Sequence, residues 1–334
     1  MAERSSPQDQ PPRRTGWAPA ALPAPPRPAP PRPAPPGVVA PDATGERPRV
    51  VAVPISSVRR LLSLLIAGFA GLLGIGLIFG AQTAGVGWAR IPYAIVIGGI
   101  QALFVLAFTM ALRPPGIRVV AAVGLLTALA ADIAAVAPQQ VTVAPLGFIA
   151  VAGFAAGVIG QLVRREGRIR VTESLGATLV IVVGVIAYAT LIVLTRLPIG
   201  TQAIVVCLAA AGLAMVVARL VDTVAPFPRL APQVPRGAAG VVIGAMLGTA
   251  AAAYLGAHLR GFEPGNAALI GLVAAVAAVL ADLSVGYAEA GRRIAGEPPT
   301  MWVARHLQGP LAGFALAAPL AYLLSVIFFV PRYF

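Results

Sequence analysis

Residues 175–195 read LGATLVIVVGVIAYATLIVLT, an apolar run that holds no Asp, Glu, Arg, Lys or His. A helix of about 20 apolar residues is long enough to cross the ~30 Å hydrocarbon core of a bilayer. Runs of similar length and composition lie on both sides of this one. The segment therefore predicts a membrane-spanning helix, and its repetition predicts an all-α polytopic membrane protein.

The rest of the chain divides into apolar spans of similar length. The predicted spans are 61–80, 91–112, 119–137, 141–163, 175–195, 201–218, 237–258, 267–288 and 308–330. They make about nine transmembrane helices. Residues 57–334 are then a single polytopic transmembrane domain.

The composition agrees with a protein whose main solvent is lipid. Apolar residues make up 58% of the 334 positions and charged residues 11%, with a mean hydropathy of +0.86. This leaves too little polar surface to cover a soluble globule.

The net charge of +13 comes from arginine, because the sequence has no lysine. Most arginines flank apolar runs, where basic residues orient helices, so we expect no nucleic-acid partner. A single cysteine, Cys207, excludes a disulfide framework and a multi-cysteine metal site.

Residues 1–56 differ in composition from the rest of the chain. They include PPRR at 11–14 and PAPPRPAPPRPAPP at 23–36, with few large apolar residues to bury. Such a segment cannot offset the entropy that folding removes, so we predict a disordered, proline-rich cytoplasmic tail. The tail could recruit a protein partner that binds proline-rich chains, or it could be inert and solubilising.

Arginines are unevenly distributed between alternate connections. One set of segments holds Arg47, Arg49, Arg59, Arg60, Arg113, Arg118, Arg164, Arg165, Arg168, Arg170, Arg219, Arg229, Arg236, Arg292, Arg293 and Arg305. The other set holds Arg90, Arg196, Arg260 and Arg332. Basic residues accumulate in loops that stay in the cytoplasm. The pattern predicts a cytoplasmic N-terminus and an exterior C-terminus in the cell (inner or plasma) membrane.

Glycine spacing suggests how the helices pack. The run Gly240, Gly244 and Gly248 places small residues on one helical face. We interpret these glycines as sites of close backbone contact and assign them no chemical role.

Three ionisable residues lie inside predicted spans or at their ends. A charged group in a span is costly and therefore a candidate functional site. Asp132 is near the outer end of its span, where a carboxylate can snorkel or bond locally, and His258 is at an outer helix end. Asp282 is deeper, about 22 Å along its helix at 1.5 Å per residue. Asp282 is thus the position that most needs an explanation.

Asp282 shares a helical stripe with Glu289 and Arg293. The two carboxylates are two turns apart, about 10 Å, which is too far to share a metal ion. A magnesium site would need a second acid, and Asp222 in the loop after the sixth span is the candidate. Alternatively, Asp282 pairs with an arginine, a common way to hold one buried charge. Phosphates could be neutralised by the nearby arginines Arg229, Arg236, Arg292 and Arg293.

Residues 268–324 include the triplet Ala281-Asp282-Leu283, then the pair Arg292 and Arg293, then His306. These features resemble the signature end of the phosphatidate cytidylyltransferase (CDP-diacylglycerol synthase) family, which has Gly-Asp-Leu, a Lys-Arg pair and a Pro-Gly-His-Gly-Gly turn. The loop before the seventh span also resembles the family's Ser-Pro-Lys-Lys segment, with Pro235, Arg236 and Gly244 matching. The resemblance covers 201–334.

The resemblance implies a cytidylyltransferase-type helical fold. It also implies magnesium-dependent transfer of a cytidylyl group from CTP to phosphatidic acid at the cytoplasmic face. In the enzyme interpretation the metal ligands would be Asp282, which matches the family's Gly-Asp-Leu and is the candidate catalytic residue, and Asp222, the second acid proposed above from its position in the loop. Substrate would be bound by Arg236, Arg292, Arg293 and His306.

Several family positions carry other residues here. The family's Ser-Asp reads Leu213-Ala214, its second lysine reads Gly237, and its glutamate reads Gly240. The Lys-Asp pair falls in AGEPP, where Glu297 is the acid, and the residues after the histidine read Leu307, Gln308, Gly309 and Pro310. Too few cations and anions remain for a triphosphate and its metal.

We therefore expect a catalytically degenerate relative that acts as a lipid-binding or partner-binding membrane scaffold. Its partners would be membrane lipids, with anionic phospholipid suited to the arginine-rich loops, and a homo-oligomer is compatible with this interpretation. One alternative is an active, magnesium-dependent cytidylyltransferase of phospholipid synthesis. A second alternative is a small-solute or ion transporter that uses Asp132 and Asp282.

Overall fold

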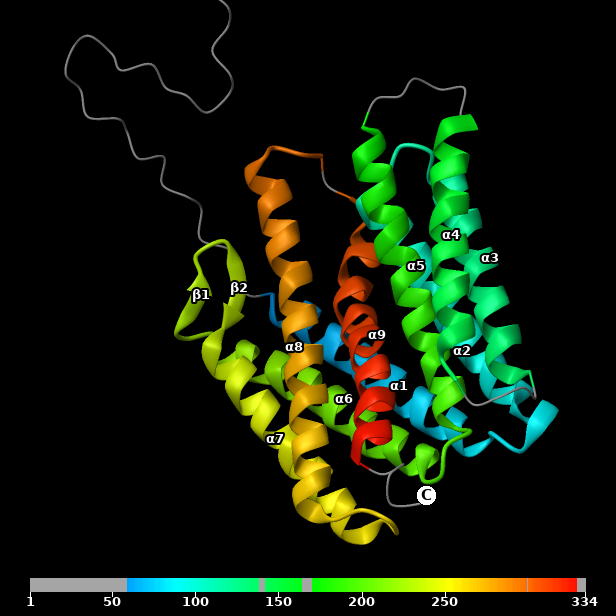
Figure 1. Cartoon of the computed structure of the whole chain (residues 1–334). Coiled ribbons are helices and arrows are strands. Elements are labelled where there is room, and N and C mark those ends of the chain that lie inside the picture. Colours follow the sequence, from blue (N-terminus) through cyan, green and yellow to red (C-terminus); the bar gives the residue numbers. More distant parts are fainter. Residues whose placement is uncertain (1–58, 138–141, 164–169, 299, 329–334) are drawn as a thin grey trace, which may run out of the picture. The chain divides into compact units, whose positions relative to one another are not determined.

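The computed structural model describes residues 59–137, 142–163, 170–298 and 300–328. Within these ranges nine helices are long and apolar enough to cross a membrane, which confirms the predicted all-α polytopic class. The predicted tail, 1–56, lies outside the described residues. The helices are α1 (Arg60–Gln82), α2 (Ile91–Leu112), α3 (Ile117–Val136), α4 (Ala144–Val163), α5 (Val171–Leu194), α6 (Gly200–Val224), α7 (Ala238–His258), α8 (Pro264–Ile294) and α9 (Trp302–Phe328) (Figure 1).

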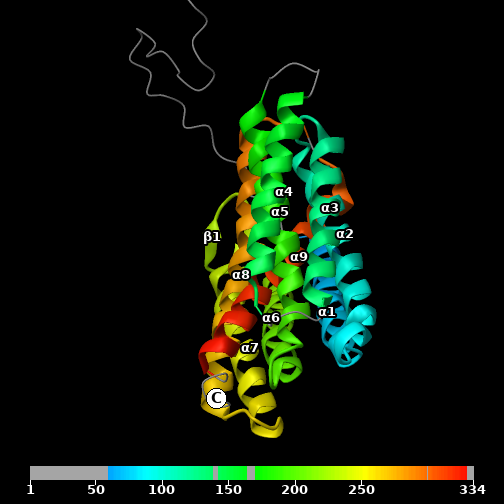
Figure 2. The same cartoon turned by 45° about the vertical axis from the view of Figure 1, so that its right-hand side comes forward.

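The run that opened the sequence analysis forms α5, which is the most deeply buried of these helices. It packs against α2, α3, α4 and α9 (Figure 2). Tyr188, fully buried on α5, donates a 2.7 Å hydrogen bond from its hydroxyl to the carbonyl oxygen of Leu311 on α9. An apolar run on a central helix is buried on nearly all sides, so the sequence of α5 is apolar all round.

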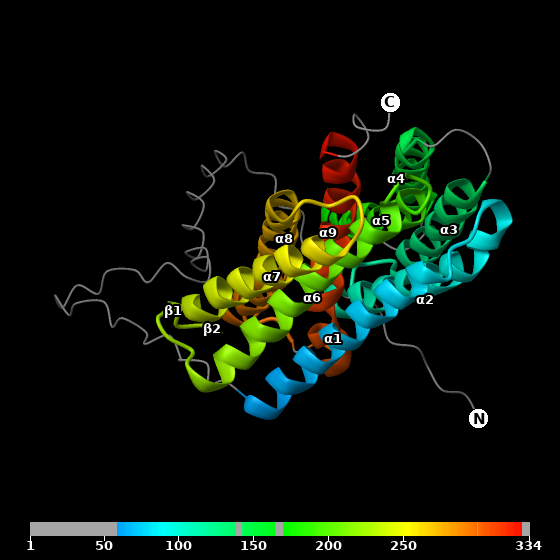
Figure 3. The same cartoon turned by 90° about the horizontal axis from the view of Figure 1, so that it is seen from below.

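A second group of helices packs around α6, which contacts α1, α7, α8 and α9. In Figure 3, α8 and α9 are seen nearly end-on, whereas α1, α6 and α7 run across the view. The glycines of α7 allow this close crossing, because a Cβ on Gly244 or Gly248 would lie 2.5 Å from a carbonyl oxygen of α6. The glycine run therefore serves helix packing, as predicted.

Three helix ends depart from the predicted spans by six residues. α6 continues to Val224, α8 runs for 31 residues to Ile294, and α9 begins at Trp302. Asp222 is consequently a helical residue on α6, and the prediction that placed it in a loop was wrong. At 1.5 Å per residue α8 is about 46 Å long, so its last turns extend beyond a ~30 Å hydrocarbon core.

A small antiparallel hairpin, which the sequence analysis did not predict, connects α6 and α7. Its strands are β1 (Arg229–Ala231) and β2 (Val234–Gly237). Val234 and Arg236 of β2 are buried, and the strand contacts α6, α7 and α8. The hairpin is thus fixed to the helices by β2.

Contacts gather the arginine-rich segments at one end of the helices. The Arg292 guanidinium donates to the carbonyl oxygen of Ala111 at the end of α2, and the Ser63 hydroxyl of α1 donates to that of Arg219 on α6. The Ser174 hydroxyl of α5 donates to the carbonyl oxygen of Pro115, before α3. We call this end of the bundle the arginine-rich end.

Candidate functional site

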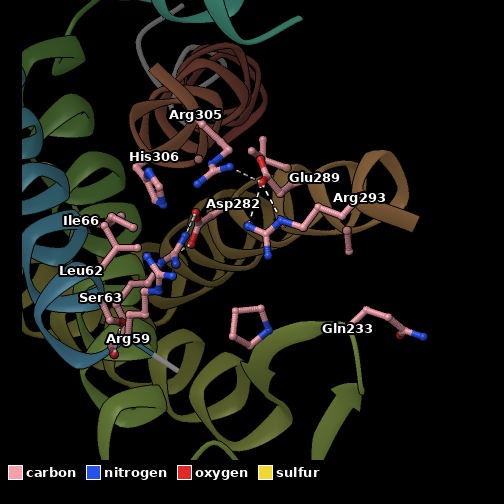
Figure 4. Close-up of a pocket in the computed structure, with 16 residues that line it drawn as sticks. Arg59, Leu62, Ser63, Ile66, Gln233, Asp282, Glu289, Arg293, Arg305 and His306 are labelled. Carbon is pink, nitrogen blue, oxygen red and sulfur yellow. Dashed lines mark hydrogen bonds and ion pairs between the residues drawn. The ribbon is translucent and has the colours of Figure 1, made fainter. Parts of the chain in front are cut away.

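The arginine-rich end contains a cavity of about 540 Å³ between α1 and α8 (Figure 4). α6 packs against both of these helices and contributes Arg219 to the lining, while α9 and the hairpin contribute further lining residues. Charged lining residues are Arg59, Arg219, Arg293, Arg305, Asp282 and Glu289. The site therefore has four guanidinium groups against two carboxylates.

Asp282, 2% exposed, is the centre of the buried charges beneath this cavity. Arg219 of α6 forms a two-point ion pair with it, in which Nε donates to Oδ2 at 3.0 Å and Nη2 donates to Oδ1. Arg236 of the hairpin donates from Nη1 to Oδ2 at 2.6 Å. Both oxygens of the carboxylate thus accept from guanidinium groups of other segments.

Arg236 also joins Asp282 to Asp222. Its Nε lies 2.8 Å from Oδ2 of Asp222, whose Oδ1 accepts the backbone N–H of Gly237 at 2.9 Å. The order Asp222, Arg236, Asp282, Arg219 alternates in sign, with formal charges that cancel. Buried charges are tolerated when each has an opposite partner in good geometry, so these four groups are held as one unit.

Two glycines make room for this cluster. A Cβ on Gly240 of α7 would lie 2.7 Å from Oδ1 of Asp222, and a Cβ on Gly309 of α9 would collide with Oδ1 of Asp282. Both helices can approach the carboxylates only because a side chain is missing at these positions. The two glycines therefore contact the charged cluster, whereas the sequence analysis gave glycine no role near a site.

Glu289 organises the outer part of the cavity. Its carboxylate lies 2.8 Å from the guanidinium of Arg293 on the same helix and 2.8 Å from that of Arg305 on α9, while Arg292 is 3.8 Å away. Figure 4 shows Arg293 and Arg305 converging on this one acid. Three arginines around one carboxylate leave this part of the site positively charged, and anionic groups of a ligand would be attracted to it.

The part of the cavity wall that the first two turns of α1 form is charged at one end and apolar at the other. Arg59 lies just before the helix, and the lining then passes through Leu62 and Ser63 to Ile66. These residues share one helical face, so charge at one end gives way to apolar surface about 10 Å further along. This wall matches an amphiphilic molecule that has an anionic head.

The carboxylates do not fit a magnesium site. Mg²⁺ needs free carboxylate oxygens in octahedral geometry, but those of Asp282 and Asp222 face guanidinium or backbone N–H groups. Among the described residues no group of three or more His, Cys, Asp or Glu side chains is placed to hold a metal ion. Two cations within 3 Å would repel any metal at this position.

The other predicted site residues are distributed around the cavity. Arg293 and His306 line it, and Nδ1 of His306 lies 2.5 Å from the carbonyl oxygen of Trp302. Arg292 does not line it but borders a smaller cavity of about 280 Å³ on the other side of Glu289. Arg236 and Asp222 belong to the buried cluster.

The sequence analysis assigned no site role to Arg59, Arg219, Arg305 or Gly309, although all four line the cavity. Three of these were used only to orient the helices. Arg219 could have been found from its position one turn before Asp222, had α6 been extended beyond residue 218.

Asp132 and His258 lie away from the cavity. Asp132 is buried, and its Oδ1 accepts a 3.0 Å hydrogen bond from Nε2 of Gln101 on α2. The carboxylate is therefore bonded locally, and the snorkelling alternative was wrong. His258 is exposed at the end of α7, where its Nδ1 lies 2.8 Å from the carbonyl oxygen of Tyr254.

Comparisons with protein-family models, with curated proteins and with solved structures find no match to this chain.

Proposed function

We propose that this chain is a multi-pass membrane protein that binds the phosphate of an anionic phospholipid in the cavity at the arginine-rich end. In this proposal it is a catalytically degenerate relative of the CDP-diacylglycerol synthases, with binding retained and cytidylyl transfer lost. The relationship rests on the sequence resemblance of residues 201–334. The binding function is supported by the charges and shape of the cavity.

The observation that carries the proposal is the pairing of Asp282. Both of its oxygens accept from Arg219 and Arg236, so the acid serves to hold guanidinium groups in place beneath the cavity. A transferase that works through magnesium needs the same acid free for the metal. The pairing favours a site that presents cations to a phosphate over one that presents carboxylates to a metal.

A lipid fits the cavity better than a free anion does, because the α1 wall continues from Arg59 into Leu62 and Ile66. Asp282 lies 18 residues after the first residue of α8, or about 27 Å, close to the ~30 Å thickness of the hydrocarbon core. The cavity would then lie at the depth of the lipid head groups. A phosphate could meet the arginines there while the first acyl carbons contact the apolar wall.

We place the arginine-rich end on the cytoplasmic side of the cell membrane. Lys and Arg are enriched in cytoplasmic loops, and anionic lipids are enriched in the cytoplasmic leaflet. The described arginines at this end are Arg59, Arg60, Arg113, Arg118, Arg170, Arg219, Arg229, Arg236, Arg292, Arg293 and Arg305, against Arg90, Arg196 and Arg260 at the other.

The adjacent residues Arg59 and Arg60 provide a matched test, because Arg59 lines the cavity and Arg60 does not. Purified protein in a neutral detergent would be titrated calorimetrically with short-chain phosphatidate, with phosphatidylcholine of the same chain length, and with glycerol phosphate. We expect phosphatidate to bind best. Arg59→Gln should weaken it about tenfold through loss of one charge-assisted hydrogen bond, and Arg60→Gln should leave it unchanged.

Two results would contradict the proposal. Equal effects of Arg59→Gln and Arg60→Gln would mean that charge near the membrane, not the cavity, attracts the lipid. Binding of glycerol phosphate as tightly as phosphatidate would mean that the apolar wall contributes nothing and that the ligand is a soluble anion.

A further inference from the structure

The β1–β2 hairpin has an inner side that packs against the rest of the protein and an outer side that is exposed. On the inner side Gln233 and Pro235 line the cavity, and Arg236 is held between two carboxylates. On the outer side Phe227, just before β1, is 65% exposed, and Leu230 is 39% exposed. The outer side of the hairpin therefore presents two large apolar side chains.

The position of the hairpin limits what that environment can be. It is joined directly to α6 and α7, two helices that are apolar enough to span a membrane, so it cannot move far from the membrane boundary. In Figures 1 and 3 it lies at the edge of the helical bundle, beside α7. Exposed apolar residues also lead up to it along α6, ending with Leu220 and Val224. Exposed apolar side chains thus occur both at the end of α6 and on the hairpin that follows it.

The chemistry of the outer side matches the interfacial layer of a bilayer. Aromatic side chains gather at the level of the head groups, and arginines there interact with lipid phosphates. The guanidinium of Arg229 lies over the ring of Phe227, 5.8 Å from its centre. A ring beside a cation combines an apolar surface with a charged edge, as an interfacial site requires.

We propose that the hairpin is a lipid-contacting element. Phe227 and Leu230 lie among the lipid head groups and first acyl carbons, and Arg229 lies at the phosphates. The hairpin then separates the bilayer from the arginine-lined cavity, with lipid on its outer side and cavity on its inner side. This inference concerns the outer side alone and does not depend on which molecule the cavity binds.

Spin labelling can test this placement, because the chain has a single cysteine, Cys207, which is buried, and a Cys207→Ala background leaves an introduced cysteine as the only thiol. In this Cys207→Ala background, Phe227→Cys and, separately, Leu230→Cys would be labelled with a nitroxide. The protein would be reconstituted into vesicles of phosphatidylcholine and phosphatidylglycerol. Accessibility to oxygen, which concentrates in the bilayer, would be compared with accessibility to a water-soluble nickel complex. Leu72→Cys on the exposed face of α1 provides the lipid reference, and Glu297→Cys on the α8–α9 connection provides the water reference.

We expect labels at 227 and 230 to resemble the label at 72, with oxygen collisions exceeding those of the nickel complex. Labels that behave like the one at 297 would place the hairpin in water and overturn the proposal. Labels shielded from both reagents would also overturn it, because they would show that protein, such as a second copy of the chain, covers this surface. If one of the two substitutions prevents folding, label accessibility can still be measured at the other position.

Discussion

Arg236 on the hairpin and Asp282 on α8 form a buried ion pair, with Nη1 2.6 Å from Oδ2, and neither side chain is more than 4% exposed. The pair joins the loop after the sixth span to the eighth span. Because Arg236 also meets Asp222 and Asp282 also meets Arg219, loss of any one of the four side chains leaves the cluster with one uncompensated charge.

The first prediction concerns removal of the central charge. Asp282→Asn should lower the free energy of unfolding by about 3–5 kcal/mol, because Arg219 loses its carboxylate partner and Arg236 keeps only Asp222, so the cluster holds one uncompensated positive charge. The measurement is denaturant unfolding in detergent, with Glu297→Gln as an exposed control. Addition of magnesium or a chelator should not change the wild-type curve. A magnesium-dependent gain in wild-type stability that vanishes in Asp282→Asn would indicate a metal ligand instead.

A second prediction uses the close approach of α9 to the carboxylate. Gly309→Ala should destabilise the protein, since the new methyl group would collide with Oδ1 of Asp282. We expect a loss of about 1–3 kcal/mol, the usual range for overpacking. Gly291→Ala on α8 is the control, because a Cβ there meets no atom within 4 Å. Equal melting temperatures for Gly309→Ala and wild type would show that the helices are not packed this closely.

Gln101 provides a third prediction in the other half of the bundle. Its Nε2 donates both to Asp132 and, at 2.9 Å, to the carbonyl oxygen of Val185. Gln101→Leu leaves both acceptors without this donor and should cost about 1–3 kcal/mol of unfolding free energy. Gln82→Leu at the exposed end of α1 should have little effect. If Gln101→Leu and Gln82→Leu have the same melting temperature, the buried amide of Gln101 contributes nothing to stability.

Topology is the subject of the fourth prediction. The arginine distribution predicts that the two ends of the chain lie on opposite sides of the membrane. Reporter fusions after Pro54 and after Phe334 should therefore report cytoplasm and exterior, respectively. If both fusions report the same side, the number of spans must be even and the assignment of the arginine-rich end must be revised.

The sequence predicted the nine spans because each apolar run is about as long as a bilayer is thick. It predicted helix ends less well where a helix leaves the hydrocarbon. The last turns of α6 and α8 carry Arg219, Asp222, Glu289 and Arg293, and hydropathy cannot distinguish a charged helical turn from a loop. The hairpin was missed because it is short and rich in proline, without the alternating pattern of a strand.

The site was only partly predictable for a different reason. Asp282 stood out because a carboxylate in a span is costly, but its partner Arg219 is 63 positions away in the sequence. Nothing local relates the two residues, because α6 and α8 meet only through packing. Gly309 was similarly unrecognised, since its role depends on the carboxylate that it faces across the helix interface.

We propose that the paired carboxylates hold the arginines of a binding site and do not serve a metal-dependent transferase. To test this, the purified protein is incubated in mixed micelles with labelled CTP, phosphatidate and magnesium. Formation of CDP-diacylglycerol is then measured. A known synthase in the same micelles shows that the conditions support turnover. We expect no product above the level without protein. Product that requires magnesium and disappears in Asp282→Asn would contradict it and establish the enzyme alternative.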